Sequence, residues 1–153
     1  MAVLQDIIEK IKNVALLQPE VNAFGEGSVY ELLNGGGGIE RYAAVIATVS
    51  SVSIERNHGN YSIKLNLFYV DRLINFSKSE NYNSEYKQNN RLQIQDTAID
   101  VLNNIFVILT EDEDYEYNSI TFTPFTENFA DNCAGAYATL TISTSISTCG
   151  EDY

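Results

Sequence analysis

Basic residues are missing from the last 62 positions of the chain: no lysine or arginine follows Arg91, although eleven carboxylates do. Residues 1–91 carry ten acidic and nine basic side chains, so eleven of the twelve net negative charges belong to the C-terminal part. Such a segment repels phosphate and anionic lipid. The charge distribution therefore argues against nucleic-acid or membrane-surface binding through residues 92–153, and together with the strand pattern it favours a structural subunit over an enzyme.

Histidine and cysteine are also scarce. The one histidine, His58, lies in an expected hairpin turn, where a catalytic triad or a zinc site would need partners that converge on the same tip. Cys133 and Cys149 are sixteen positions apart, which fits neither a metal-binding pair nor a disulfide framework. We therefore expect reduced thiols in an intracellular protein, with Cys133 as a small buried apolar residue. No catalytic residue, metal or cofactor is expected.

Long apolar runs are absent. No stretch of about 18 apolar residues occurs, so no membrane span is expected. Asp6 and Glu9 interrupt the N-terminal apolar residues, which is unlike a signal peptide. A hydrophobic content of 44% over 153 residues predicts one globular domain, residues 1–153. Residues 34–38, a glycine loop, and residues 75–91, a polar loop, are expected as exposed insertions in it.

Two helices are predicted from apolar residues at three- and four-residue spacing. The first has an apolar stripe that begins at Val3 and continues to Ala15, and Pro19 ends it. The second covers about residues 92–110. Its expected inward residues are Ile94, Ala98, Val101, Leu102, Ile105, Ile108 and Leu109, and its expected outward residues are Gln95, Asp96, Asp100, Asn103 and Asn104.

Strands are predicted between and after the helices. Residues 41–56 form a long strand whose alternation changes phase near Ser50 and Ser51, which indicates a β-bulge. A turn at residues 57–60 leads into residues 61–72, which alternate cleanly and complete a hairpin.

Two more strands, residues 119–125 and 134–148, follow the second helix, and residues 28–33 are a further short strand candidate. At about 3.3 Å per residue the last strand would reach roughly 50 Å, more than a small domain covers. Its ends, like those of residues 41–56, must bend or pair with another chain. The order α-β-β-α-β-β predicts an α+β fold with two helices packed on an antiparallel-rich sheet of four or five strands.

Glycines and one acid–base pair are the first candidates for functional residues. The run Gly35, Gly36, Gly37 and Gly38 lacks the lysine and hydroxyl residue of a phosphate-binding loop, so we expect a flexible loop or one that assembly orders. Asp71-Arg72 is expected to be a positioning salt bridge at a sheet edge or subunit contact rather than a catalytic pair.

Charged residues supply the second group of candidates. Glu111, Asp112, Glu113, Asp114 and Glu116 lack the alternating ligands and central glycine of a calcium loop, so they are expected to form a solvated acidic surface. In an oligomer, Arg41, Arg56 or Lys64 of one subunit would meet the acidic part of the next.

The order of elements resembles the small tail-terminator and head–tail connector proteins of tailed bacteriophages, and the last part is similar to ring proteins of crAss-like phages. The features that carry the resemblance are the N-terminal amphipathic helix, the glycine loop, the hairpin ending Tyr69-Val70-Asp71-Arg72, the second helix, and Pro124-Phe125-Thr126 leading to Phe129-Ala130-Asp131-Asn132-Cys133-Ala134-Gly135 before a long strand. The resemblance implies a non-enzymatic virion subunit that forms hexameric or dodecameric rings at the portal–tail junction. It carries over no individual functional residue.

Several functional hypotheses remain open. A ring subunit would contact portal, adaptor or tail proteins and surround a channel through which DNA passes without specific binding, because an acidic lining does not hold phosphate. Alternatively, an acidic binding or inhibitor module would target a basic nucleic-acid-handling protein. A hydrolase with an unrecognised site is the third hypothesis.

Overall fold

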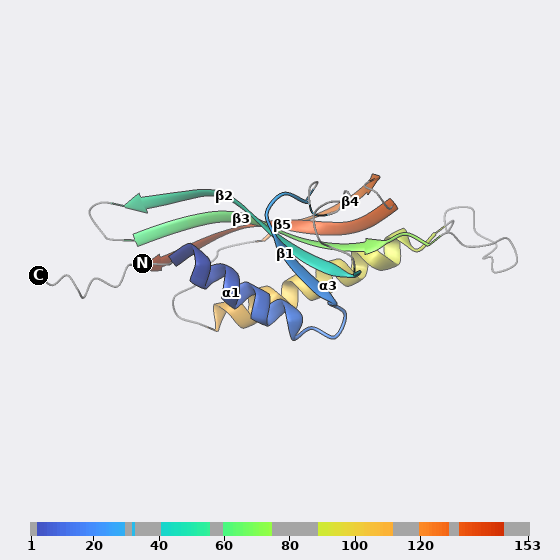
Figure 1. The fold of residues 1–153 in the computed structure, drawn as a ribbon, viewed down its shortest axis with the longest axis horizontal. Helices are drawn as coiled ribbons and strands as arrows, with labels where there is room; N and C mark the ends of the chain where they lie inside the picture. The colour runs from blue at the N-terminus through green and yellow to red at the C-terminus, as the bar shows by residue number, and fades with distance from the viewer. Residues whose placement is uncertain are drawn as a thin grey trace, which may run out of the picture.

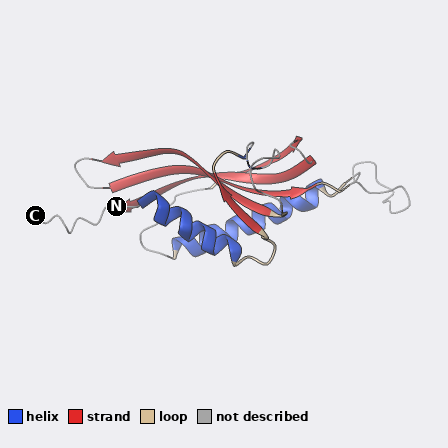
Figure 2. Cartoon of the chain, in the orientation of Figure 1, coloured by secondary structure: helices blue, strands red, loops and turns tan. Residues whose placement is uncertain are grey.

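The described part of the chain folds into two layers, a five-stranded sheet and two long helices that lie along one of its faces (Figures 1 and 2). This computed structural model describes residues 3–29, 32, 41–55, 60–74, 89–111, 120–128 and 132–145. The helices are α1 (Val3–Leu16) and α3 (Arg91–Thr110). The strands are β1 (Ala23–Glu26), β2 (Ala44–Glu55), β3 (Asn60–Arg72), β4 (Phe122–Asn128) and β5 (Asn132–Ser145). The α+β class expected from the sequence is confirmed.

The sheet is mixed. Its strand order is β1-β2-β3-β5-β4, with β1 parallel to β2 and every other neighbouring pair antiparallel. The order of elements along the chain is therefore α-β-β-β-α-β-β. The hairpin expected from residues 41–72 is present as β2 and β3, and β3 is the central strand of the sheet.

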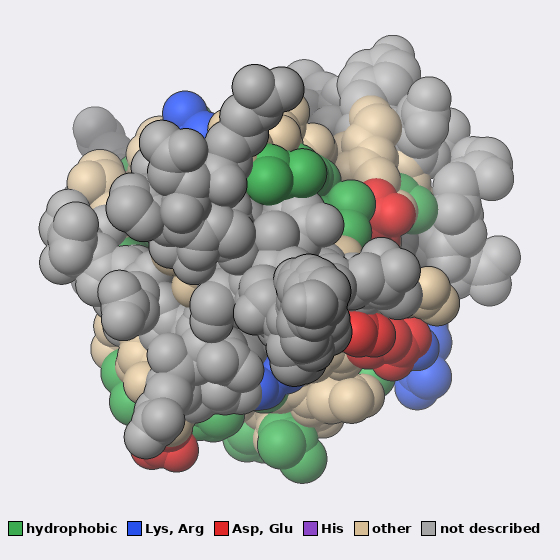
Figure 3. Space-filling view, turned by 90° about the vertical axis from the view of Figure 1, so that its left-hand side faces the viewer, with side chains coloured by type: hydrophobic (Ala, Val, Ile, Leu, Met, Phe, Trp, Pro, Cys, Tyr) green, Lys and Arg blue, Asp and Glu red, His purple; other side chains and the backbone are tan. Residues whose placement is uncertain are grey.

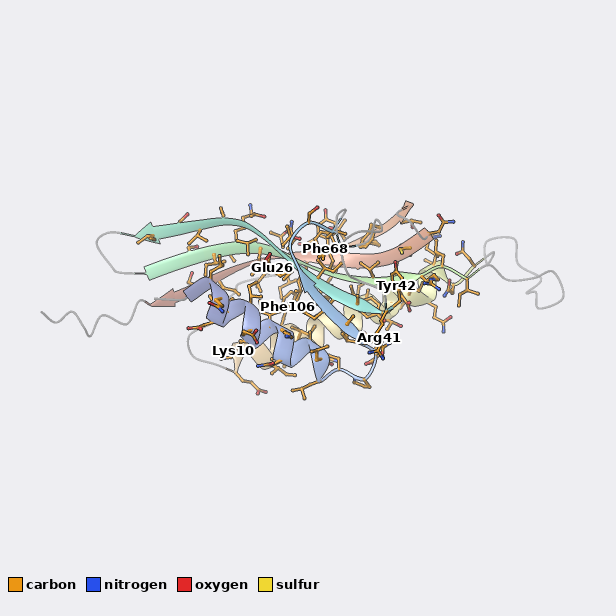
Figure 4. All side chains as sticks on the ribbon, in the orientation of Figure 1. Lys10, Glu26, Arg41, Tyr42, Phe68 and Phe106 are labelled. Carbon is orange, nitrogen blue, oxygen red and sulfur yellow. The ribbon has the colours of Figure 1, made fainter. Side chains whose placement is uncertain are left out.

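One hydrophobic core lies between the helices and the sheet. The apolar residues of each strand alternate, so that Ile63, Leu65, Leu67 and Tyr69 of β3 all face the helices. On β5 the same face carries mainly alanines (Ala134, Ala136 and Ala138). Small side chains leave room for the bulky residues of α3 opposite them, and Phe106 is fully buried there. Figure 4 shows Phe106 on the helix side of the sheet and Phe68 on the opposite side.

The predicted bulge in β2 is confirmed by a register shift between Val49 and Ser51. Before the shift Val49 pairs with Leu65, and after it Val52 pairs with Ile63. Since directly opposed residues share a face, the bulge keeps valines on the helix side although their spacing changes from two to three residues. Without the extra residue, the apolar positions after Ser51 would face the other way.

The prediction of a short strand at residues 28–33 is wrong. Val29 and Leu32 have helical backbone, and the Leu32 N–H donates to the Ser28 carbonyl at 3.0 Å. The strand that precedes β2 is β1, which ends at Glu26. It contains only four residues and pairs in parallel with a distant segment, so no local alternation marks it.

Two positions on α3 were assigned to the wrong face. Gln95 is buried, with 8% of its surface exposed, and Ile108 is 37% exposed. The helix begins at Arg91, one residue before the expected start. A hydrogen bond compensates for the burial of the Gln95 amide, as described below, and sequence spacing does not reveal such a partner.

The residues at the two ends of the expected polar loop, residues 75–91, are hydrogen-bonded to each other. The Asn90 side chain accepts a hydrogen bond from the Ile74 N–H at 2.7 Å, and the Asn90 N–H donates to the Ile74 carbonyl at 3.3 Å. Residues 75–88 and the glycine loop of residues 34–38 lie outside the described residues. These bonds hold the end of β3 close to the start of α3.

Candidate assembly surface

The face of the sheet away from α1 and α3 carries an aromatic cluster. The Phe68 ring centroid lies 5.0 Å from that of Tyr137 and 6.0 Å from that of Phe125, and the last two centroids are 6.5 Å apart. All three side chains are partly exposed. Aromatic contacts at these separations add stability beyond the area they bury, so this cluster ties β3, β5 and β4 together from the outer face.

A small apolar cluster lies beside these rings on the same face. It consists of Ile46, Val70 and Cys133, with Val29 and Leu32 packed against it. Cys133 is fully buried, which confirms its expected role as a small apolar residue.

Asp71 and Arg72 lie at the end of β3. The sequence predicts that they lie at a sheet edge or a subunit contact. Because β3 is the central strand, they lie at a strand end and not on a sheet edge, and the subunit contact stays a prediction. The Asp71 carboxylate accepts a hydrogen bond from the Arg72 N–H at 2.8 Å, and the Arg72 guanidinium lies 5.0 Å from the centre of the Tyr42 ring. Burial raises the pKa of Asp71, and both the N–H bond and the charge of Arg72 partly oppose that shift.

Arg41 is exposed and directly precedes Tyr42, which places two cations near the same end of the sheet (Figure 4). Arg56 lies outside the described residues. Lys64 is exposed in the middle of the outer face and pairs across the sheet with Thr141.

β2 and β5 extend past the short strands β1 and β4 that lie outside them in the sheet. β1 pairs with β2 only from Ala44 to Ala47, and β4 pairs with β5 only from Asn132 to Ala138. Gly27 extends the cover of β2 by one residue, because the Thr48 hydroxyl donates to its carbonyl at 2.7 Å. Beyond these points residues 49–55 of β2 and residues 139–145 of β5 pair with β3 on one side, and no described strand pairs with them on the side away from β3. Figure 1 shows β2, β3 and β5 running on together at the end where the N-terminus lies. These two stretches are called the open edges below.

The side chains of the open edges are polar on one face and aliphatic on the other. Ser51, Ser53, Thr139, Thr141 and Ser143 are exposed, and Thr139 donates to the Asn66 side chain at 2.7 Å. On the helix side, Leu140 and Ile142 of β5 are buried, whereas Val52 and Ile54 of β2 are 44% and 58% exposed. Figure 3 looks onto this end of the molecule, where hydrophobic side chains reach the surface.

The flanking strands differ from the open edges in a way that bears on assembly. β4 carries Pro124, which lacks an N–H and obstructs the addition of a further strand. β1 is only four residues long. Residues 139–145 contain no proline and no charged residue. Natural sheets usually protect such an edge, so these stretches are the part of the described sheet best suited to pairing with another chain.

Only the first residue of the expected acidic surface lies within the described residues. Glu111 is exposed and caps α3, donating its N–H to the Ile108 carbonyl at 3.2 Å. Asp112, Glu113, Asp114 and Glu116 lie outside them. Val107 and Ile108, four and three positions before Glu111 on α3, are also exposed.

No protein-family model matches the chain, and no curated protein matches it. Within the described ranges no three His, Cys, Asp or Glu side chains gather closely enough to hold a metal ion. Neither helix of the described part is long and apolar enough to cross a membrane. The sequence did not mark the residues of the open edges as a candidate site. The unusual length of the strands predicted from residues 41–56 and 134–148 did indicate that part of each would extend beyond its neighbours.

Proposed function

We propose that this protein is a structural subunit that assembles into a ring at the head–tail junction of a tailed bacteriophage. The proposal that subunits assemble rests on the two open edges, residues 49–55 of β2 and 139–145 of β5. On its side away from β3, each presents backbone N–H and C=O groups for which the described chain supplies no strand partner, and a strand from another subunit satisfies them by extending the sheet.

The positions of the two open edges favour a ring over a simple pair. They lie on opposite sides of β3, so a contact between them joins two different surfaces of neighbouring subunits. Contacts of this kind repeat from one copy to the next and close into a ring when the rotation between copies permits it. A hexamer or a dodecamer is the expected copy number.

The virion assignment is supported by the resemblance in element order and by charge. A net charge of −12 suits a subunit near packaged DNA that must slide without adhering, because each exposed cation would add phosphate contacts. In this proposal the subunit contacts portal, adaptor or tail proteins, assembles in the host cytoplasm, and performs no catalysis.

Charge also supports a second candidate. An acidic module that occupies the binding surface of a basic nucleic-acid-handling protein needs the same net charge and no ring. Such binding would weaken steeply as salt is raised, and it would leave the open edges without a role.

Light scattering after size exclusion, together with negative-stain imaging, tests the ring. The expected result is a defined oligomer, six- or twelve-fold, with a central opening. A strict monomer at the highest soluble concentration, alone and after addition of candidate neighbours, would overturn the proposal. A monomer that captures a basic nucleic-acid enzyme would instead support the second candidate.

A further inference from the structure

We propose that residues 139–145 of β5 in one copy pair in parallel with residues 49–55 of β2 in the next copy, so that one sheet continues from subunit to subunit. This rests on the proposed ring, and it specifies the two surfaces, their relative direction and their register.

The two open edges lie at the same level of the sheet. Ser62 of β3 pairs with Ser53 on one side and with Ser143 on the other. Ile63 likewise pairs with Val52 and Ile142. A neighbouring copy shifted sideways within the sheet plane therefore brings its β5 stretch beside the β2 stretch without sliding along the strands.

The direction follows from the topology. Both β2 and β5 are antiparallel to β3, so they are parallel to each other. Rotation about a ring axis that runs along the strands preserves strand direction, whereas a two-fold axis across them reverses it. Head-to-tail repetition thus requires parallel pairing of β5 with β2. A two-fold dimer would instead require antiparallel pairing of β5 with β5 or of β2 with β2.

The side chains match in this arrangement. Ser53 and Ser143 both belong to the hydroxyl-rich outer face, and Val52 and Ile142 both belong to the helix face. A slip by one residue would place aliphatic side chains among the hydroxyls, so burial selects the register. Val52 and Ile54, exposed in a single copy, gain aliphatic neighbours from the adjoining strand.

Cross-linking distinguishes the pairings. In a Cys149→Ser background, Ser53→Cys and Ser143→Cys are prepared separately and as a double variant, and each is treated with a short bis-maleimide. Cys133 is fully buried and serves as the non-reacting native thiol. The expected result is a covalent dimer in the mixture of the two single variants, none in either alone, and a ladder up to the ring size in the double variant.

The other outcomes separate this inference from the proposed function. Covalent dimers of Ser143→Cys alone, or of Ser53→Cys alone, indicate two-fold pairing and overturn the head-to-tail contact. Rings seen by imaging without any cross-link between these positions overturn the strand pairing but leave the ring proposal standing. A strict monomer overturns both.

A matched pair of lysine variants gives a second readout. Ser143→Lys places a charge on the open edge of β5 opposite the uncharged Ser62, and Thr123→Lys adds the same charge on β4 beside Pro124. Lysine on an edge strand discourages pairing, so Ser143→Lys is expected to weaken self-association at least about tenfold, and Thr123→Lys is expected to leave it unchanged. Equal effects of the two variants, with both folded by circular dichroism, would contradict the edge contact.

Discussion

Gly135 of β5 lies directly against the backbone carbonyl of Tyr69 on β3, and a Cβ atom at position 135 would overlap that oxygen. The same Cβ would come within 3.2 Å of the Phe125 ring. Glycine at this position lets the aromatic cluster close over the sheet while β5 keeps its register beside β3.

Gly135→Ala is therefore expected to destabilise the fold by about 1–3 kcal/mol or more, because backbone and not a flexible side chain would have to move. Urea unfolding followed by circular dichroism measures the change. Ser143→Ala, an exposed substitution on the same strand, is the control and should stay within about 0.5 kcal/mol of the parent protein. Equal stability of the two variants would contradict the close approach.

Gln95 joins α3 to β4, and its removal should loosen that contact. The Gln95 amide donates to the Phe125 carbonyl at 3.1 Å, and its oxygen accepts from Arg91 at 3.4 Å. Gln95→Ala leaves the Phe125 carbonyl without this donor and should cost about 1–3 kcal/mol. Asp96→Ala, at the exposed neighbouring position, controls for the general effect of alanine on the helix. If both variants unfold at the same urea concentration, the hydrogen bond contributes nothing.

Asp71 predicts a defined pH dependence of stability. Its pKa is raised by burial, so the folded state prefers the protonated carboxyl. The stability due to protonation is fully present below the pKa of the unfolded chain and is lost as pH rises through the higher pKa of the folded state. Asp71→Asn keeps an acceptor for the Arg72 N–H and removes the ionisation.

The difference in unfolding free energy between Asp71→Asn and the parent should therefore shift in favour of the variant as pH rises from the acid range through the raised pKa. Denaturation at a series of pH values measures this difference, and the values at low pH, where both side chains are neutral, provide the internal reference. A difference that is constant across the series would show that Asp71 ionises equally easily in both states.

Val52 and Ile54 should matter for assembly and little for folding. Both are largely exposed on the open half of β2, so Val52→Thr combined with Ile54→Thr keeps strand preference while it removes apolar surface. Weaker self-association with an unchanged melting temperature is expected, measured by sedimentation and by calorimetry. Leu17→Thr, at a site that is 73% exposed beyond the end of α1, is the matched control. An equal loss of association in the control would point to non-specific hydrophobic contact.

Salt separates strand pairing from charge pairing. Subunits that each carry a net charge of −12 repel one another, so association through backbone and aliphatic contacts should strengthen as ionic strength rises and the Debye length falls to about 3 Å near 1 M. Contacts between Arg41 or Lys64 and the acidic part of a neighbour would weaken instead. Sedimentation at low and high salt shows whether self-association strengthens or weakens as salt is raised. Sucrose at matched viscosity is the control.

Much of the fold was predictable from local pattern. The hairpin of β2 and β3, the bulge between Val49 and Ser51 and the inward residues of β3 follow from alternation with a period of two, and α1 follows from its apolar stripe. The burial of Gln95 was missed because it depends on a carbonyl thirty residues away. The candidate glycines and most acidic residues fall outside the described part of the chain.

The sequence by itself determined the number and face of the long strands, the charge imbalance after Arg91 and the excess of strand length, because periodicity, charge and length are properties of the chain. Only the tertiary structure decided which parts of those strands have no second neighbour among the described strands. That depends on the parallel addition of β1 and on the point where β4 leaves β5, which are long-range pairings that no local pattern encodes. Strand length predicted that the strand ends bend or pair with another chain, and strand order indicates the edges at which a neighbour binds in the proposed ring.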